Sequence, residues 1–145
     1  INVDLKNSVI LDLFSGSGSF GLEAISRGAK KCLFVENYPS ALLSLDKNIK
    51  NLKCQESSHL NKLDCFKFIK NVQKNELKLD IIFLDPPYRE ERINFIIEEI
   101  LKKNILNKNG IIIIHRHKRD NIKLTEKLNI IDLRLYGISK IIFAN

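Results

Sequence analysis

The sequence predicts an α/β fold in which helices cover both faces of a doubly wound, mostly parallel sheet of seven strands. Short apolar runs alternate with amphipathic helical patterns along almost the whole chain, and this alternation is typical of sheets built from β-α-β units. The runs are nearly continuous in apolar residues, which indicates strands that are buried on both faces. The last two runs have no helix between them, so we expect an antiparallel hairpin at the C-terminal end.

The first half of the chain contains the patterns of three strands and three helices. We expect the strands at residues 8–14, 30–36 and, weakly, near 57–63, and the helices at 19–28, 38–52 and 64–72. Gly28 can end the first helix because it tolerates a left-handed backbone, and Pro39 suits the first turn of the second. Helical spacing gives that second helix one apolar face, made of Leu42, Leu45, Ile49 and Leu52.

The second half predicts four further strands and one helix. We expect the strands at residues 79–85, 110–115, 129–135 and 139–145, and the helix at 90–104, with an inward face made of Ile93, Ile96, Ile97, Ile100 and Leu101. Asn109-Gly110 marks the start of the fifth strand, and Tyr136-Gly137 separates the last two. No linker, repeat or low-complexity segment interrupts the pattern, so residues 1–145 are expected to form one domain.

Composition and charge narrow the class of protein. Hydrophobic residues make up 44% of the 145 residues, which is enough for a packed core and too many for a disordered chain. The net charge of +7 favours a polyanionic partner such as nucleic acid, although lysines scattered among Asn and Ile also fit a bias in codon usage. No apolar run reaches the roughly 18 residues of a membrane span.

The cysteines indicate a reducing compartment. Their number is odd and no two form a C-x-x-C pair, which argues against a disulfide framework or a zinc site. We expect Cys32 and Cys65 to be small buried residues, and the protein to be cytoplasmic. The chain begins with Ile and contains no Met, so we also expect that an N-terminal piece is missing.

The stretch LDLFSGSGSFGLEA, residues 11–24, predicts a cofactor site. Gly16, Gly18 and Gly21 have the spacing G-x-G-x-x-G between a strand and a helix. Glu36 closes the next strand, 20 residues after Gly16. Glycines in such a turn let a cofactor approach the backbone, and an acidic residue after the second strand binds ribose hydroxyls. Nicotinamide dinucleotides and other adenosine cofactors fit this pattern equally well.

Asp12 favours one of these cofactors. A carboxylate just ahead of the glycine loop repels the pyrophosphate of a dinucleotide, because both groups are negative. S-adenosylmethionine has no phosphate, and its methionine end carries an ammonium group beside a sulfonium, which Asp12 can attract directly or through water. The alternative is structural: Asp12 caps a helix or braces the loop.

A second motif, LDPPY at residues 84–88, predicts an acceptor site. It ends the fourth strand, which a doubly wound order places next to the first, so it is expected to face the glycine loop. Pro86 and Pro87 leave no backbone N–H across the pair, so the turn offers acceptors, the Asp85 carboxylate and the Pro86 carbonyl. These acceptors suit the exocyclic amine of a nucleobase, on which Tyr88 can stack. A plain loop is the alternative.

Several runs taken together resemble one family. The runs LDLFSGSGSFGLEAISRGA, VEN, LDPPY and LYGISKIIF are similar to those of the RsmD family, and the resemblance covers nearly the whole chain. Members are bacterial class I S-adenosylmethionine-dependent methyltransferases that act on guanine N2 in 16S ribosomal RNA. The resemblance implies a Rossmann-like fold, S-adenosylmethionine as cofactor and ribosomal RNA as partner, within a partly assembled small subunit. We expect a monomer.

The resemblance also implies roles for individual residues. The methionine end of the cofactor would be lined by Asp12, Phe14, Gly16 and Gly18. Glu36 would bind the ribose hydroxyls, with Asn37 beside the adenine. Asp64 would accept from the adenine amine, and the backbone N–H of Cys65 would reach a ring nitrogen. Gly21 is expected to permit close helix–sheet packing rather than to contact the ligand. The target base would be held by Asp85, Pro86, Pro87 and Tyr88.

The chain departs from the family in two places. Family members usually begin with a basic segment and a helix, whereas only INVDLKN precedes the first strand here. Their fifth strand usually ends in an acidic residue, whereas this one ends in HRHKRD. His115 and His117 are expected to share one strand face, but two histidines without a third ligand make a poor metal site. We therefore expect no metal and interpret the stretch as a solvated or phosphate-facing basic patch.

Other functions are compatible with parts of the sequence. A nicotinamide-dependent oxidoreductase shares the glycine loop but has no use for DPPY. Amino-methyltransferases that act on DNA adenine N6 or on a protein glutamine share DPPY. A non-catalytic RNA-binding module would explain the positive charge but would not need both motifs.

Overall fold

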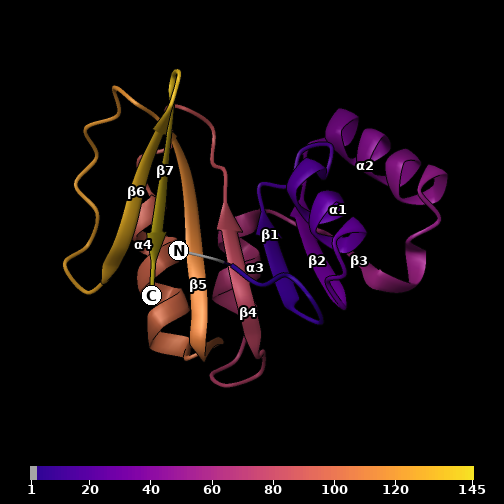
Figure 1. Cartoon of the computed structure of the whole chain (residues 1–145), viewed down its shortest axis with the longest axis horizontal. Coiled ribbons are helices and arrows are strands. Elements are labelled where there is room, and N and C mark those ends of the chain that lie inside the picture. The colour runs from indigo at the N-terminus through magenta and orange to yellow at the C-terminus, as the bar shows by residue number, and fades with distance from the viewer. Residues whose placement is uncertain (1–2) are drawn as a thin grey trace.

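The computed structural model describes residues 3–145, which form one sheet of seven strands with helices on both faces (Figure 1). The strands are β1 (Val9–Leu13), β2 (Lys31–Glu36), β3 (Ser58–Lys62), β4 (Leu79–Leu84), β5 (Leu106–His117), β6 (Ile130–Tyr136) and β7 (Ser139–Ala144). Their order in the sheet is β3-β2-β1-β4-β5-β7-β6. Neighbouring strands from β3 to β5 are parallel, and β7 runs antiparallel to β5 and β6. The predicted doubly wound sheet with an antiparallel C-terminal hairpin is confirmed.

Two helices pack on each face of the sheet. The helices are α1 (Ser19–Ser26), α2 (Pro39–Asn51), α3 (Cys65–Asn71) and α4 (Ile93–Lys103), and a short 3₁₀ helix, η1 (Gln55–Ser57), precedes β3. One core lies under α1 and α2 and includes Leu22, Ala24, Leu45 and Ile49. The other lies under α3 and α4 and includes Ile69, Ile93, Ile96, Ile97 and Ile100. Burial of each large apolar side chain contributes about 1.5–3 kcal/mol, so these two cores hold the layers together.

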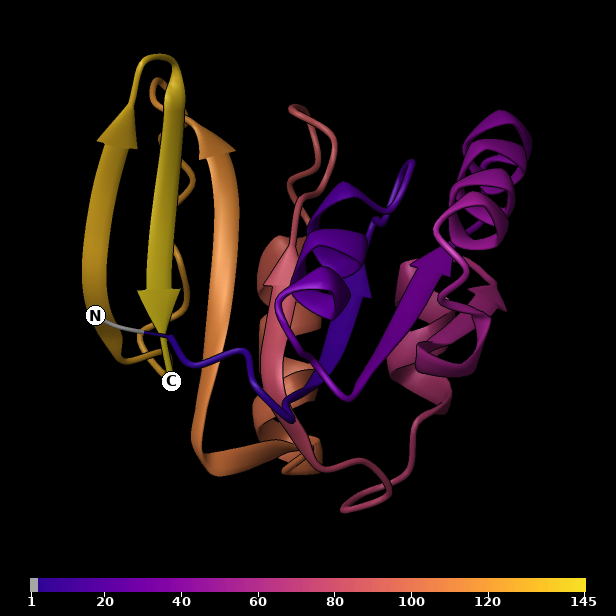
Figure 2. The same cartoon turned by 45° about the vertical axis from the view of Figure 1, so that its right-hand side comes forward.

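Helices cover only part of the sheet face on which α1 packs. Figure 2 shows α1 and α2 near β1, β2 and β3, whereas the β5, β7 and β6 side of that face carries no helix within residues 3–145. An apolar groove of about 420 Å³ lies there, and its lining includes Phe20, Phe83, Ile113, Ile141 and Phe143. The rings of Phe20 and Phe83 stack at a centroid distance of 3.9 Å, so α1 reaches the edge of this groove.

The direction of winding changes between β1 and β4. The chain runs from β1 outward to β2 and β3, and then returns through α3 to β4 on the other side of β1. The carboxyl ends of β1 and β4 therefore lie side by side. The backbone N–H of Asp85, just after β4, donates to the carbonyl of Leu13 at 3.4 Å. Ligands of open α/β sheets bind at such a switch point.

The packing around the start of α1 leaves no room for a Cβ atom at two of the glycines. A Cβ atom on Gly21 would lie 2.4 Å from the ring of Phe34 and 2.5 Å from Sγ of Cys32, both on β2. A Cβ atom on Gly18 would lie 2.4 Å from Leu45, and Gly18 also has a left-handed φ of +84°. Helix α1 can approach the sheet this closely only because residue 21 has no side chain, which confirms the packing role predicted for Gly21.

Strand β5 is longer than predicted. It begins at Leu106, so Asn109 and Gly110 lie inside the strand instead of before it. Leu106 pairs with Leu79 of β4, and the register between the two strands then shifts by an irregularity before the regular pairing begins. Pairing with β4 thus overrides the local tendency of Asn-Gly to form a turn.

Helix α2 buries a narrower face than predicted. Leu45 and Ile49 are buried, and Leu42 is partly buried. Leu52 is 61% exposed because the helix ends at Asn51, before the face completes another turn. The predicted apolar face was therefore right at its centre and wrong at its C-terminal end.

The structure also describes the state of the cysteines and the length of the helices. Cys32, Cys54 and Cys65 are free thiols. Cys32 and Cys65 are buried, as predicted. Within residues 3–145, no helix is both long and apolar enough to cross a bilayer.

Candidate active site

Asp12 is buried in β1 and braces the start of α1. Its residue is 1% exposed, and its carboxylate accepts a hydrogen bond from the backbone N–H of Gly21 at 3.1 Å. Burial is the main reason that the pKa of Asp12 is raised to about 7; the Gly21 hydrogen bond opposes the shift, and the charges of Asp85 and Glu36 add to it. The bracing role, which was the structural alternative, is therefore present. Attraction of a cofactor cation stays a prediction.

The loop after β1 is tied to β2 and α3. The hydroxyl of Ser15 donates to the carbonyl of Asp12 at 2.6 Å and accepts from the backbone N–H of Val35 at 2.9 Å. Phe14 has a left-handed φ of +62°, and its N–H donates to Sγ of Cys65 at 3.2 Å. Burial raises the pKa of Cys65 to about 12, so the thiol stays neutral. Sequence reasoning missed Ser15, because a serine in a glycine-rich loop carries no distinctive signal.

Glu36 holds two loops at the end of β2. Its carboxylate accepts backbone N–H groups from Gly16 at 2.9 Å and from Asn37 and Tyr38 at 2.8 Å each. The glycine loop and the turn into α2 are therefore fixed to one side chain. A carboxylate that accepts several backbone hydrogen bonds is well ordered, so it can present its remaining acceptor positions in a defined direction.

A cavity of about 430 Å³ lies at the switch point. Its lining consists of Phe14, Glu36, Asn37, Tyr38, Ala41, Asp64, Phe66, Asp85, Pro87, Glu90 and Arg92. The predicted cofactor residues that face it are Phe14, Glu36, Asn37 and Asp64. The remaining predicted ones, which do not line it, are Asp12, Gly16, Gly18 and Cys65. Phe14, which precedes the glycines, and Asp85 and Pro87, which follow β4, thus face one space, whereas cofactor contact by Gly16 and Gly18 stays a prediction.

One wall of this cavity combines aromatic rings with an ion pair. The guanidinium of Arg92 lies 3.9 Å from the centroid of the Phe66 ring, and Phe66 meets Phe14 edge to face at 6.0 Å. Arg92 also pairs with Glu90 at 2.8 Å, and this hydrogen-bonded contact lowers the pKa of Glu90. Asp64 lies at the N-terminus of α3 and accepts from the N–H of Lys67 at 3.0 Å, so one of its oxygens is used as a helix cap.

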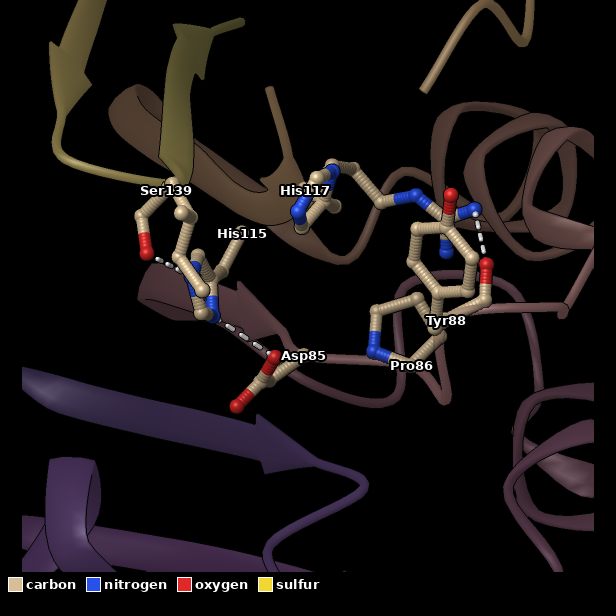
Figure 3. Close-up of a pocket in the computed structure, with 8 residues that line it drawn as sticks. Asp85, Pro86, Tyr88, His115, His117 and Ser139 are labelled. Atoms are coloured by element: carbon tan, nitrogen blue, oxygen red, sulfur yellow. Dashed lines mark hydrogen bonds and ion pairs between the residues drawn. The ribbon is translucent and has the colours of Figure 1, made fainter. Parts of the chain in front are cut away.

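A smaller pocket of about 200 Å³ shares Asp85 with the first cavity (Figure 3). It is lined by Asp85, Pro86, Tyr88, His115, Arg116, His117, Ile138 and Ser139. Tyr88 is 60% exposed, and its ring meets His117 edge to face at 5.2 Å. The predicted acceptor residues are therefore divided: Pro87 faces the larger cavity, Pro86 and Tyr88 face the smaller pocket, and Asp85 faces both.

His115 was expected to belong to a solvated or phosphate-facing basic patch. The structure instead places it in the lining of the smaller pocket, where it contacts Asp85 and Ser139. Its Nδ1 lies 2.8 Å from Oδ1 of Asp85, and its Nε2 lies 2.9 Å from Oγ of Ser139. His115 and His117 do share a strand face. The missed signal was the register of the parallel strands: Leu84 pairs with Ile114, so the next residues, Asp85 and His115, are neighbours.

Arg116 was also predicted to belong to the basic patch, and for this residue the prediction is wrong. Its residue is 6% exposed, and it forms an ion pair with Asp120. The guanidinium donates to the carbonyls of Pro87 at 3.4 Å and of Tyr88 and Glu90 at 3.3 Å each. Burial opposes ionisation of Asp120, but hydrogen bonds from the Ile122 N–H and from Arg116 lower its pKa overall. Arg116 is therefore buried, and its guanidinium holds the backbone that follows Asp85 in place.

Among residues 3–145, no group of three or more His, Cys, Asp and Glu side chains is arranged to hold a metal ion. His115 in particular uses both ring nitrogens on Asp85 and Ser139. The groups that the candidate site offers to a ligand are therefore carboxylates, backbone carbonyls and aromatic rings.

Two curated relatives share most of the chain. Ribosomal RNA small subunit methyltransferase D from Haemophilus influenzae is 33% identical over 135 residues, which cover 92% of this chain and 69% of that protein. The protein of the same name from Buchnera aphidicola subsp. Acyrthosiphon pisum is 38% identical over 120 residues, which cover 81% of this chain and 60% of that protein. The matched region thus spans 60–69% of the length of these two relatives.

A solved structure and a family model agree with this similarity. A conserved hypothetical protein from Streptococcus pyogenes has a TM-score of 0.84 and 31% identity, and the match covers 95% of this chain and 86% of that one. The model of the family described as conserved hypothetical protein 95 matches residues 1–145. With its glycine loop, its DPPY turn and these relatives, the chain belongs to that family, which is the RsmD family.

Proposed function

We propose that this protein is an S-adenosylmethionine-dependent methyltransferase that transfers a methyl group to the exocyclic N2 amine of a guanine in small-subunit ribosomal RNA. The observation that carries the proposal is the position of Asp85, which lines both the 430 Å³ cavity and the 200 Å³ pocket. A methyl donor in the first space and an amine in the second would meet at this carboxylate. The names of the two curated relatives support the same reaction.

The residues around the larger cavity fit S-adenosylmethionine. A volume of about 430 Å³ lies within the usual range of ligand pockets, about 300–1,000 Å³. Glu36, Asp64 and Asp85 face the cavity, and such carboxylates suit ammonium and sulfonium groups but repel a pyrophosphate. Glu36 stands at the end of β2, where an acidic side chain can accept from ribose hydroxyls. These features disfavour a nicotinamide dinucleotide.

Positioning accounts for most of the proposed catalysis. The bound cofactor supplies a methyl group on a sulfonium, whose sulfur leaves as a neutral thioether, so no nucleophilic side chain is needed. The carboxylate of Asp85 and the carbonyl of Pro86 can accept the two hydrogens of the target amine. These acceptors hold the nitrogen in line and favour the positive charge that develops on it during transfer.

Access to the pocket restricts the acceptor. A guanine inside a helix cannot bring its amine into a recessed pocket, so the target has to be unpaired or flipped out. Tyr88 is 60% exposed beside the pocket, which leaves its ring available to stack on such a base. The small pocket at Asp85 thus suits a single displaced base.

The substrate is assigned from charge and from the relatives. A net charge of +7 attracts phosphates without reading sequence. Single-stranded loops of RNA present unstacked bases, so the shape of a presented loop would supply specificity. We propose that a partly assembled small subunit presents that loop, and that the protein acts on it as a monomer in the cytoplasm.

The test is methyl transfer from labelled S-adenosylmethionine to small ribosomal subunits, naked ribosomal RNA, DNA and protein in parallel, followed by mass mapping of the product. We expect N2-methylguanosine in the ribosomal RNA of the subunit. Methyladenine in DNA or methylglutamine in protein as the dominant product would contradict the substrate, and no transfer to any acceptor would contradict the activity.

A further inference from the structure

Three polar side chains from three strands form a continuous hydrogen-bonded chain beside the acceptor pocket (Figure 3). Asp85 follows β4, His115 lies near the end of β5, and Ser139 begins β7. Nδ1 of His115 lies 2.8 Å from Oδ1 of Asp85, and Nε2 lies 2.9 Å from Oγ of Ser139. The imidazole therefore bridges the carboxylate and the hydroxyl.

The hydrogen-bonding chemistry sets the direction of this chain. An ionised carboxylate can only accept, so Nδ1 of His115 has to carry the hydrogen in the contact with Asp85. In a neutral imidazole the other nitrogen is then an acceptor, and the hydroxyl of Ser139 can donate to it. Because a hydroxyl can donate or accept, the Asp85 carboxylate selects the tautomer, and Ser139 completes the chain by donating to Nε2.

The same contacts leave one carboxylate oxygen available. Oδ1 of Asp85 is used by His115, whereas Oδ2 has no hydrogen-bond partner among residues 3–145. The side chain of Asp85 is 46% exposed and that of His115 is 33% exposed, so the pair borders the pocket without being sealed in the core. A ring fixed at both nitrogens restricts the rotation of the carboxylate and hence the direction of Oδ2.

We propose that His115 is a positioning residue of the methyl-transfer reaction, which holds the Asp85 carboxylate through Oδ1 so that Oδ2 receives the target amine, and that Ser139 positions His115. This inference rests on the proposed function and deepens it. It assigns a task to the histidine at the end of β5, in the place where sequence reasoning expected a basic patch. Misplacement of a reacting group by about 1 Å can cost on the order of 100-fold in rate, which sets the scale of the effect.

The first experiment measures the tautomer of His115 in ¹⁵N-labelled protein by NMR and needs no activity. We expect a protonated Nδ1 and an unprotonated Nε2 in the wild type. In Asp85→Ala, which removes the acceptor, the preference for the Nδ1 tautomer should be lost. A ring protonated mainly at Nε2 in the wild type would overturn the assignment.

The second experiment compares turnover in His115→Leu and His115→Asn. Leucine removes the donor, so we expect kcat to fall by roughly 10–100-fold while the Kd of S-adenosylmethionine and the KM of the RNA stay within about twofold. Asparagine can still donate near the position of Nδ1, so it should recover most of the loss. His59→Leu, an exposed histidine on β3, is the matched control and should leave kcat unchanged.

The third experiment asks whether His115 acts through Asp85. Asp85→Asn leaves only one acceptor oxygen, so the side chain can no longer accept from both Nδ1 of His115 and the target amine. Some turnover should remain through that oxygen, and adding His115→Leu should then lower kcat by less than about threefold. Effects that multiply would show that His115 acts independently and would overturn the proposal. Unchanged kcat in His115→Leu with an active wild type would overturn it as well. A wild type that methylates no RNA would instead refute the proposed function, and with it this role.

Discussion

The two sides of the β1–β4 switch point are held together by different kinds of contact. On the cofactor side, carboxylates accept from backbone N–H groups, as Glu36 does from three of them. On the acceptor side, side chains contact other side chains or backbone carbonyls. Asp85 contacts the ring of His115, and Arg116 donates to the carbonyls of Pro87, Tyr88 and Glu90. On the first side the Glu36 carboxylate fixes two backbone segments, whereas on the second Asp85 is held by another side chain, His115.

This difference predicts how each side responds to substitution. The backbone donors persist in every variant, so the cofactor loop should be broken by removal of its carboxylates, Asp12 and Glu36, or by residues that alter its path, such as its glycines. The acceptor side has few backbone contacts of this kind around Asp85 and Arg116, so single side-chain changes should have larger effects there. Single substitutions on the two sides therefore test this contrast.

Removal of Arg116 should produce the largest loss of stability. In Arg116→Ala the carboxylate of Asp120, whose side chain is 7% exposed, loses its buried cation. Breaking a buried pair costs about 3–5 kcal/mol, so we expect a fall of this size in the free energy of unfolding measured with urea. Lys118→Ala, at an exposed neighbour, should change that free energy by less than about 0.5 kcal/mol. Equal effects of the two variants would contradict the anchoring role.

Asp85→Ala should lower turnover by roughly 100–1,000-fold, because it removes an acceptor aimed at the developing charge. The Kd of S-adenosylmethionine, measured by calorimetry, should stay within about twofold of the wild type, since the rest of the cavity lining remains. Glu36→Ala should show the opposite pattern, with weaker cofactor binding. Near-normal turnover in Asp85→Ala would refute its role in holding the amine.

Gly21→Ala should destabilise the fold by about 1–3 kcal/mol, because a Cβ there would collide with Phe34 and Cys32 on β2 and overpack the core. Gly16→Ala is a useful comparison, since a Cβ at Gly16 meets no atom within 4 Å and the cost comes only from its left-handed φ of +56°. Thermal unfolding of both variants measures the difference. A larger loss in Gly16→Ala would show that strain, and not packing, governs this loop.

Asp12 should make stability depend on pH. Its pKa in the folded state, about 7, lies above the ordinary value of 3.8. Between these two values the native state binds more protons than the unfolded chain, so this group's contribution to stability falls as pH rises and levels off above about 7. The slope is on the order of 1 kcal/mol per pH unit. Asp12→Asn should lack this component in urea unfolding between pH 4 and 7; identical profiles for the two proteins would contradict the raised pKa.

The fold was largely predictable because its signals are local. Continuous apolar runs and helical periodicity each reflect a few neighbouring residues, and they predicted the strands, the helices and the C-terminal hairpin. The errors arose where tertiary packing decides. β5 extends back to Leu106 because it pairs with β4, and Leu52 is exposed because α2 ends at Asn51.

The candidate site was predictable to a smaller extent. The two motifs indicated which loops meet, and Phe14, Glu36, Asn37 and Asp64 face the predicted cavity. His115 and Ser139 were missed or misinterpreted because their partners lie 24–30 residues away. Arg116 pairs with Asp120 four residues later, but the carbonyls that it binds lie 26–29 residues away. A basic residue has the same appearance in a sequence whether it meets solvent or a buried carboxylate. The tertiary packing around each side chain distinguishes the two cases.

Successive residues of β5 point to opposite faces of the sheet, and this alternation gives His115 and Arg116 different roles. His115 points to the acceptor pocket, whereas Arg116, one residue later, donates to the loop carbonyls that hold Asp85 and Tyr88 in place. A substitution at either position can change one task and leave the other intact. One inserted or deleted residue between Gly110 and His115 would exchange the two side chains between the faces of the sheet. The length of this strand should therefore tolerate far less variation among relatives than its composition does.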